Sequence, residues 1–322
     1  MRVAGLILAV LAFGLAPMSA GARGPRANSD EYKKSWGLEA IGARVAYNAG
    51  LTGRGVTVAI VDCGIARAQR DVIRNVSRRS TDVVEGRKLP ITDLHGAYTS
   101  APLAAALDGR GMVGVAYNAK ILSIRADVEG GLFGSCAFKP GDLAKALDFA
   151  ADQKARIVVL PLQGRKPLGV AFERALGRVV DAGGVVVIAA GNRNAAQPAW
   201  PAQYAVDPRF SGAIVVAGAT GYYGAITPWS NKAGPVKSWY IAAPGEWVLT
   251  DCKAKCHLVS GTSFSTSYVA GGLALMMEAW PDQSGRQLVG RLLAAARDAG
   301  AEGMDDVYGR GILDLTHAFG AD

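Results

Sequence analysis

Three side chains that together can activate a hydroxyl nucleophile occur far apart in this sequence. Asp62 follows an apolar run, His95 stands beside a glycine, and Ser263 precedes a stretch with helical character. A serine hydroxyl is a weak nucleophile at neutral pH, so it needs a base to take its proton and a carboxylate to hold that base in the right tautomer. Asp62, His95 and Ser263 could supply these three roles in attack on a carbonyl carbon.

The choice of base is narrow because the chain has 3 histidines. His317 lies in the tail and His257 follows a short loop between two cysteines, whereas His95 stands at a predicted helix start. We therefore favour His95. A lone histidine is more often structural than catalytic, so this choice depends on its partners.

Two further groups could stabilise a negatively charged oxygen in such a reaction. Ser263 opens a predicted helix, whose first amides and dipole favour negative charge. Asn192 follows an apolar, strand-like run and could donate its side-chain amide to the same oxyanion. Gly261 leaves room for a substrate backbone to approach Ser263.

Buried strands and helices alternate along the chain, and they must bring these groups together. Runs that are apolar on both faces predict strands, and segments of helical period predict helices between them. The predicted strands are 56–61, 121–124, 157–162, 185–190 and 213–217, and the predicted helices are 38–49, 143–153 and 170–182. This pattern predicts an α/β fold: a doubly wound, mainly parallel central sheet with helices on both faces. Functional groups then gather beyond the carboxyl ends of the strands.

Several motifs, in this order, resemble those of the subtilisin-like serine proteases, or subtilases (peptidase S8 family). The similar segments are the aspartate motif at 58–65, the histidine motif beginning at His95-Gly96, the oxyanion segment at 190–192, the serine motif at 261–263 and the closing segment at 308–314. The resemblance implies a serine endopeptidase with Asp62, His95 and Ser263 as its triad and an acyl-enzyme intermediate. It also implies an oxyanion hole formed by Asn192 and the Ser263 amide.

The same resemblance places polypeptide-binding residues at Leu162, Gln163, Gly164, Ala190 and Gly191. The family usually has Ser-Leu-Gly-Gly where this chain has Pro161-Leu162-Gln163-Gly164. A proline donates no ladder hydrogen bond, and Gln163 places a side chain where a glycine leaves room for the peptide. We therefore expect a narrower range of substrates or weaker substrate binding. The alternative to an active endopeptidase is a catalytically impaired binding or scaffold protein with a subtilase fold.

Other departures surround the triad. Residues 97–100 read Ala-Tyr-Thr-Ser where the family has Thr-His-Val-Ala, and 264–268 read Phe-Ser-Thr-Ser-Tyr where it has Met-Ala-Thr/Ser-Pro-His. Tyr98 and Tyr268 thus both replace histidines. Calcium binding, common in the family, is left open: Asp71 and Asp108 fall near one such site, but Tyr32 replaces a ligand. No cofactor is expected for the chemistry.

The first residues predict export. Met1 and Arg2 precede an apolar run and small residues, which is typical of a secretory signal peptide at 1–22 rather than of a membrane anchor. A short extension at 23–35 and a catalytic domain at 36–322 would follow, in a secreted or periplasmic protein with no stable membrane span after signal removal. The extension is too short for the family's propeptide, so either a separate inhibitor or folding helper exists or the enzyme folds unaided.

Four cysteines in an exported chain allow two disulfides in three pairings. Cys252 and Cys256 are the favoured pair, and the spacing before His257 differs from that of haem attachment. Cys63 could be inert, paired with Cys136, or redox-sensitive, and we favour inert or paired.

Composition excludes a disordered or collagen-like chain, because half of the 322 residues are hydrophobic. Lys and Arg outnumber Asp and Glu by 35 to 27, for a net charge of +8. The arginines cluster only at 67–79, with no aromatic residues among them for stacking bases. We therefore expect a solvated face there and no nucleic-acid partner.

Overall fold

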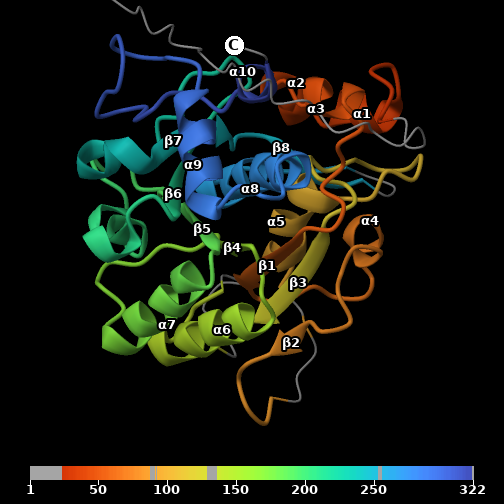
Figure 1. Ribbon diagram of the computed structural model, residues 1–322. Helices are drawn as coiled ribbons and strands as arrows, with labels where there is room; N and C mark the ends of the chain where they lie inside the picture. Colours follow the sequence, from red (N-terminus) through yellow and green to blue (C-terminus); the bar gives the residue numbers. More distant parts are fainter. Residues whose placement is uncertain (1–23, 88–90, 92, 129–135, 253–255, 321–322) are drawn as a thin grey trace, which may run out of the picture.

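The computed structural model describes residues 24–87, 91, 93–128, 136–252 and 256–320, and the predicted signal peptide at 1–22 lies outside them. Among the described residues, seven strands form one parallel sheet in the order β2-β3-β1-β4-β5-β6-β7, with helices on both sides (Figure 1). The strands are β1 (Thr57–Asp62), β2 (Thr81–Asp82), β3 (Lys120–Arg125), β4 (Ile157–Leu160), β5 (Val185–Ala189), β6 (Ile214–Thr220) and β7 (Tyr240–Pro244). The predicted doubly wound α/β fold is confirmed.

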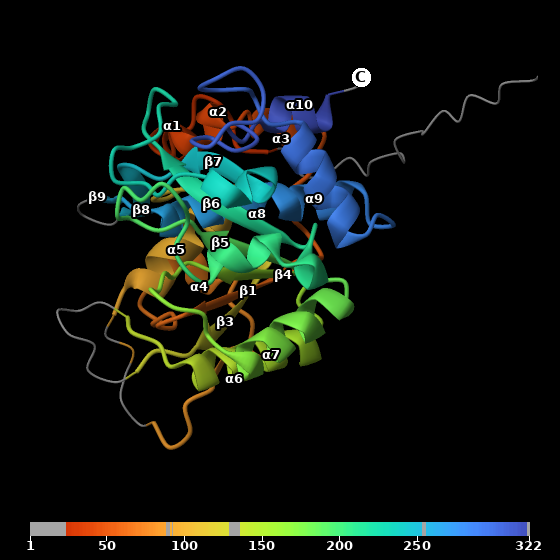
Figure 2. The same ribbon diagram turned by 90° about the vertical axis from the view of Figure 1, so that its left-hand side faces the viewer.

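Two cores lie on opposite faces of the sheet, because successive strand side chains point in opposite directions. Val58 and Ile60 join the core that contains α5 (His95–Ala104) and the buried helix α8 (Thr262–Ala279). Ala59 and Val61 join the core beneath α6 (Pro140–Asp152) and α7 (Val170–Asp181). After a 90° turn the sheet is seen between α8 and the α6–α7 pair (Figure 2).

The remaining elements frame this three-layer arrangement. They are the helices α1 (Asp30–Lys34), α2 (Gly37–Ala40), α3 (Arg44–Asn48), α4 (Arg70–Ile73), α9 (Gly285–Ala294) and α10 (Leu315–Phe319), the 3-10 helices η2 (Ala202–Val206), η3 (Pro208–Phe210) and η4 (Gly234–Trp239), and the antiparallel hairpin β8 (Val248–Cys252) and β9 (Cys256–Val259). Within the described ranges, no helix is both long and apolar enough to cross a bilayer.

The ends of the predicted elements differ from the observed ones by up to three residues, and two further differences have an identifiable cause. The predicted helix at 38–49 is divided into α2 and α3, because Gly42 adopts a left-handed φ of 66° between them. The predicted strand at 157–162 ends at Leu160, since Pro161 has no N–H to continue the ladder. That early end leaves Leu162 and Gln163 in an irregular segment at the edge of the cleft described below.

Candidate active site

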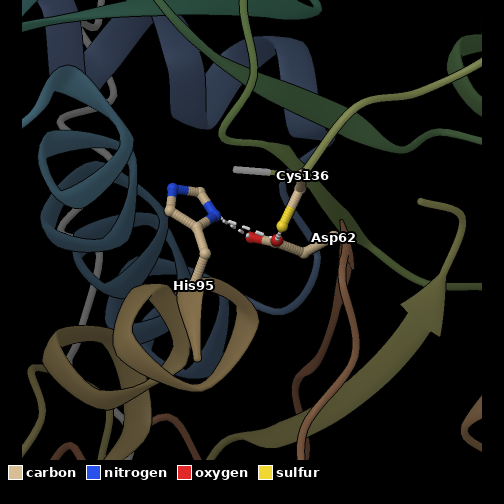
Figure 3. Close-up of side chains that lie close together, drawn as sticks. All are labelled: Asp62, His95 and Cys136. Atoms are coloured by element: carbon tan, nitrogen blue, oxygen red, sulfur yellow. Dashed lines mark hydrogen bonds and ion pairs between the residues drawn. The ribbon is translucent and has the colours of Figure 1, made fainter. Parts of the chain in front are cut away.

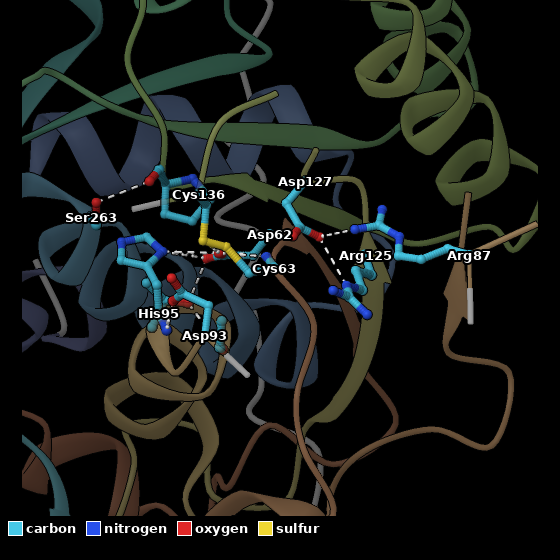
Figure 4. The surroundings of a disulfide bond; sticks show 12 residues. Asp62, Cys63, Arg87, Asp93, His95, Arg125, Asp127, Cys136 and Ser263 are labelled. Atoms are coloured by element: carbon cyan, nitrogen blue, oxygen red, sulfur yellow. Dashed lines mark hydrogen bonds and ion pairs between the residues drawn. A yellow bond between two sulfur atoms is a disulfide. The ribbon is translucent and has the colours of Figure 1, made fainter. Parts of the chain in front are cut away.

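The predicted triad residues converge beyond the carboxyl end of the sheet. Asp62 is the last residue of β1, His95 is the first residue of α5, and Ser263 is the second residue of α8. Their side chains lie around one space in the structure (Figure 4). Helix starts and a strand end thus bring together residues separated by up to 201 positions, as the parallel-sheet topology predicts.

Asp62 and His95 form a close pair (Figure 3). Nδ1 of His95 lies 2.9 Å from both carboxylate oxygens of Asp62. Asp62 is only 1% exposed, and its Oδ1 also accepts the backbone N–H of Cys63 at 2.7 Å. The backbone N–H of His95 donates to Asp93 Oδ1 at 2.7 Å, which fixes the start of α5. Asp62 can therefore hold His95 with Nδ1 protonated and Nε2 free to act as a base.

Electrostatics favour the protonated form of His95. Burial by itself lowers the pKa of the imidazole, but the charge and hydrogen bond of Asp62 and the charge of Asp93 outweigh it. The net result is a pKa above the ordinary value of 6.5. The pair is therefore suited to stabilise an imidazolium that forms when His95 accepts a proton.

Ser263 shares a cavity of about 310 Å³ with His95. Its hydroxyl donates to the carbonyl oxygen of Pro161 at 2.9 Å. A serine hydroxyl carries one proton, so transfer of that proton to His95 requires Ser263 to turn away from Pro161. The centroid of the Phe264 ring lies 6.0 Å from that of the His95 ring, and the two rings are tilted relative to each other.

Asn192 has its side-chain orientation set by the helix that carries Ser263. Its Oδ1 accepts the backbone N–H and the hydroxyl of Thr262, both at 2.9 Å. The Thr262 Oγ1 in turn accepts the N–H of Gly191 at 3.1 Å. With Oδ1 occupied, Asn192 presents its NH₂ group, which is a donor only. The Ser263 N–H is among the first amides of α8, which have no partner within the helix.

The predicted substrate-binding residues fall into two groups. Leu162 and Gln163 line the cavity, whereas Gly164, Ala190 and Gly191 are not among its described lining residues. The cavity lining comprises His95, Cys136, Phe138, Pro161, Leu162, Gln163, Ala189, Asn192, Thr262 and Ser263. The Gly164 N–H donates to the carbonyl oxygen of Trp200 at 2.6 Å.

Cys63 and Cys136 are joined by a disulfide, with a Cα–Cα distance of 6.0 Å. The bond links the residue after Asp62 to the rim of the cavity, and Cys136 Sγ lies 3.7 Å from Asp62 Oδ1 (Figures 3 and 4). In the hairpin, Cys252 and Cys256 are directly opposite, and Cys256 is disulfide-bonded. The Cys252 side chain lies outside the described part of the chain, so the predicted pairing of these two stays a prediction.

In the loop near the candidate calcium position, three backbone amides converge on one carboxylate. The backbone N–H groups of 108–110 all donate to Glu31 Oε1, at 2.8 to 3.1 Å. Tyr32 donates its hydroxyl to another glutamate, and the Asp108 carboxylate pairs with an arginine. The Asp71 carboxylate also faces this loop, close to Gly111. Calcium requires six to eight converging oxygens, so these residues do not fit the ion.

Comparison with known proteins identifies this arrangement. A model of the subtilase family matches residues 53–311, a span that contains Asp62, His95, Asn192 and Ser263. The chain belongs to the subtilase family. This subtilase is similar to Subtilisin BL of Lederbergia lenta, with 29% identity over 290 residues, 88% of this chain and 97% of the relative.

Two other relatives match at the same level. The alkaline protease of Alkalihalobacillus alcalophilus is 29% identical over 287 residues, 88% of this chain and 69% of its own length. Mycosin-1 of Mycobacterium tuberculosis is 29% identical over 317 residues, 83% of this chain and 69% of its own length. The subtilase described here is therefore a serine-type endopeptidase.

Sequence reasoning missed some residues of this subtilase's site. Phe138 and Ala189 line the cavity without a sequence signal of their own. In the sequence, Thr99 is only a departure from the family pattern, although in the structure its hydroxyl reaches Asp62. The two tyrosines at histidine positions take separate partners: Tyr98 stacks on His257, and Tyr268 packs against Gly37.

Proposed function

We propose that this subtilase cleaves polypeptides through Asp62, His95 and Ser263. The observation that carries the proposal is the 2.9 Å contact of His95 Nδ1 with the buried Asp62 carboxylate, at a cavity that also contains Ser263 and Asn192. This combination joins a base, its orienting carboxylate, a nucleophile and an oxyanion donor.

In the first half-reaction, Ser263 Oγ attacks the peptide carbonyl carbon and His95 Nε2 takes the hydroxyl proton. The carbonyl oxygen gains negative charge, and the Asn192 NH₂ group and the Ser263 N–H donate to it. His95 then gives its proton to the leaving nitrogen, so the C–N bond breaks and an acyl-Ser263 ester remains. Water, deprotonated by His95, hydrolyses that ester and restores the hydroxyl.

Leu162 and Gln163 are proposed to contact the substrate directly, since both line the cavity beside Ser263. Gly164, Ala190 and Gly191 would act indirectly, because each is next in sequence to a lining residue. Gly191 allows the close approach of Gln163, because a Cβ at its position would meet Gln163 Oε1 at 2.9 Å and its φ is 107°. We expect a narrower range of substrates than an open, glycine-lined site accepts.

We further propose that the enzyme works outside the cytoplasm, in the periplasm or the medium. The signal-like segment at 1–22 and the Cys63–Cys136 disulfide both suit an exported protein in an oxidising compartment. Cell fractionation and amino-terminal sequencing of the mature chain test this. A mature protein that begins after Ala22 is expected, and a cytoplasmic chain retaining Met1 would contradict it.

A fluorophosphonate probe tests the proposed nucleophile, because it reacts with activated serines. The wild-type chain is expected to be labelled and to cleave a casein substrate, whereas Ser263→Ala loses both. Ser265→Ala is the matched control, since Ser265 follows on the same helix and donates to the Ala243 carbonyl. A folded but unlabelled wild-type chain would favour the catalytically impaired scaffold alternative. The hydrogen bond from the Ser263 hydroxyl to the Pro161 carbonyl oxygen is compatible with that alternative.

A further inference from the structure

Thr99 lies one turn after His95 on α5 and is buried beside Asp62, at 1% exposure. Its Oγ1 is 3.1 Å from Asp62 Oδ2 and 3.1 Å from the carbonyl oxygen of Gly96. A hydroxyl has one proton to donate, so these two acceptors compete for it.

The surroundings decide this competition in favour of Asp62. The Gly96 carbonyl already accepts the Ser100 hydroxyl at 2.6 Å. The carboxylate is charged, and hydrogen bonds to charged acceptors are stronger than those to neutral ones. Asp62 is also shut off from solvent, so water cannot replace a missing donor.

The two carboxylate oxygens of Asp62 have different partners. Oδ1 accepts the Cys63 N–H and shares the Nδ1 proton of His95. Oδ2 shares that same proton, and Thr99 is its other donor among the described residues. Without the Thr99 hydroxyl, Oδ2 would depend on His95 alone.

Thr99 also links the triad to the nucleophile helix. Its carbonyl oxygen accepts the Ser267 hydroxyl at 2.6 Å, and Ser267 lies one turn after Ser263 on α8. A single residue thus contacts Asp62 through its side chain, belongs to the helix of His95 and is bonded to the helix of Ser263.

We infer that Thr99 is a positioning residue that orients the Asp62 carboxylate toward His95 by donating its hydroxyl to Oδ2. The inference rests on the proposed triad. Without this donor, the Asp62 carboxylate loses one hydrogen bond, and its negative charge is stabilised more by protonated His95. The pKa of His95 therefore rises, and a higher pH is needed to obtain the neutral base.

The test is the pH dependence of kcat/KM for Thr99→Val, which keeps the shape and removes the hydroxyl. We expect kcat/KM to fall roughly 10-fold. We also expect the midpoint of the acidic limb of the pH profile, where activity is lost as the pH falls, to shift to higher pH by about half a unit or more. Asp62 and Asp93, the charged groups that act on His95, are unchanged in the variant. A purely structural role for Thr99 would not move the limb.

Thr99→Ser is the matched variant, because it retains the hydroxyl and loses only the methyl group. Its acidic limb is expected to stay with that of the wild type. The inference is overturned if Thr99→Val keeps the acidic limb of the wild type, whatever its kcat/KM, or if Thr99→Ser shifts the limb equally. If Thr99→Val does not fold, the comparison of Thr99→Ala with Thr99→Ser gives the same test.

Failure of the proposed function has a separate signature. If the folded wild-type chain neither reacts with a fluorophosphonate nor cleaves casein, both the proposed triad and this inference are wrong. If the wild-type chain is active but loss of the Thr99 hydroxyl leaves the pH profile unchanged, only this inference is wrong.

Discussion

The side chain of Gln163 is bonded to the backbone of Asn192: its Oε1 accepts the Asn192 N–H at 3.0 Å. One residue of the cavity wall therefore braces the segment that carries the proposed oxyanion donor. Since Gln163 also lies over Gly191, it occupies space that a glycine would leave open for substrate.

Replacement of Gln163 by glycine should widen substrate preference. We expect kcat/KM for peptides with a large apolar residue before the cut to rise roughly 10-fold relative to peptides with alanine there. Cleavage of a peptide library by both forms measures this ratio. Gln163→Glu, which keeps the size and an acceptor oxygen, is the control, and an unchanged ratio in Gln163→Gly would show that this side chain does not limit the pocket.

The activity of the wild type should depend on a neutral His95. Because Asp62 and Asp93 raise the pKa of His95 overall, the acidic limb of kcat/KM should have its midpoint above 6.5. Activity is then lost as the pH falls through that midpoint. Initial rates between pH 5 and pH 9, in buffers of constant ionic strength, check this; a midpoint below the ordinary histidine value would contradict it.

Asp62→Asn should reduce kcat about 10⁴-fold, since the amide cannot hold His95 in the tautomer that leaves Nε2 free. Single-turnover measurements with an ester substrate detect the residual rate. Folding is checked by circular dichroism, and a folded variant with near wild-type kcat would show that another group orients the base.

Asn192→Ala should lower kcat roughly 10²- to 10³-fold while KM changes little. The lost NH₂ group acts mainly on charge that develops in the transition state. Thr262→Val removes the hydroxyl that holds the Asn192 Oδ1 and should cause a smaller loss of the same kind. If Asn192→Ala keeps the wild-type kcat, Asn192 is not part of the oxyanion hole.

Glu31 should stabilise the fold in the place where relatives were expected to use calcium. Its carboxylate accepts three backbone amides of 108–110, so Glu31→Gln should lower the free energy of unfolding by about 1–3 kcal/mol. Urea unfolding measures the loss. Addition of a calcium chelator should leave the wild-type midpoint unchanged, and a large shift would show that this protein does hold a structural cation.

The Cys63–Cys136 disulfide closes a loop with a sequence separation of 73 residues. Its removal in a Cys63→Ala/Cys136→Ala double variant should lower stability by about 2–5 kcal/mol. Because Cys136 lines the cavity, KM should rise as well. Treatment with dithiothreitol should reproduce these effects in the wild type, and in the double variant it should add only the smaller effect of reducing the disulfide of Cys256. A wild type insensitive to complete reduction would contradict the prediction.

Much of the fold was accessible from the sequence, because the apolar runs of β1, β4, β5 and β6 are buried on both faces and therefore continuous. The short β2 was not predicted, since two residues give no periodicity. The division of the 38–49 helix depends on the left-handed conformation of Gly42, where Thr316 of the distant α10 packs closely. A local pattern cannot show such a contact.

The sequence by itself determined which residues have the chemical capacity for acyl transfer, because only the residue type decides which group can act as acid, base or nucleophile. It also determined the order of buried strands that gathers Asp62, His95 and Ser263 at one edge. Only the tertiary structure decided the partners: Thr99 with Asp62, Gln163 with Asn192, and Glu31 with the 108–110 amides. These contacts join segments distant in sequence, and their geometry is set by how the sheet and helices pack.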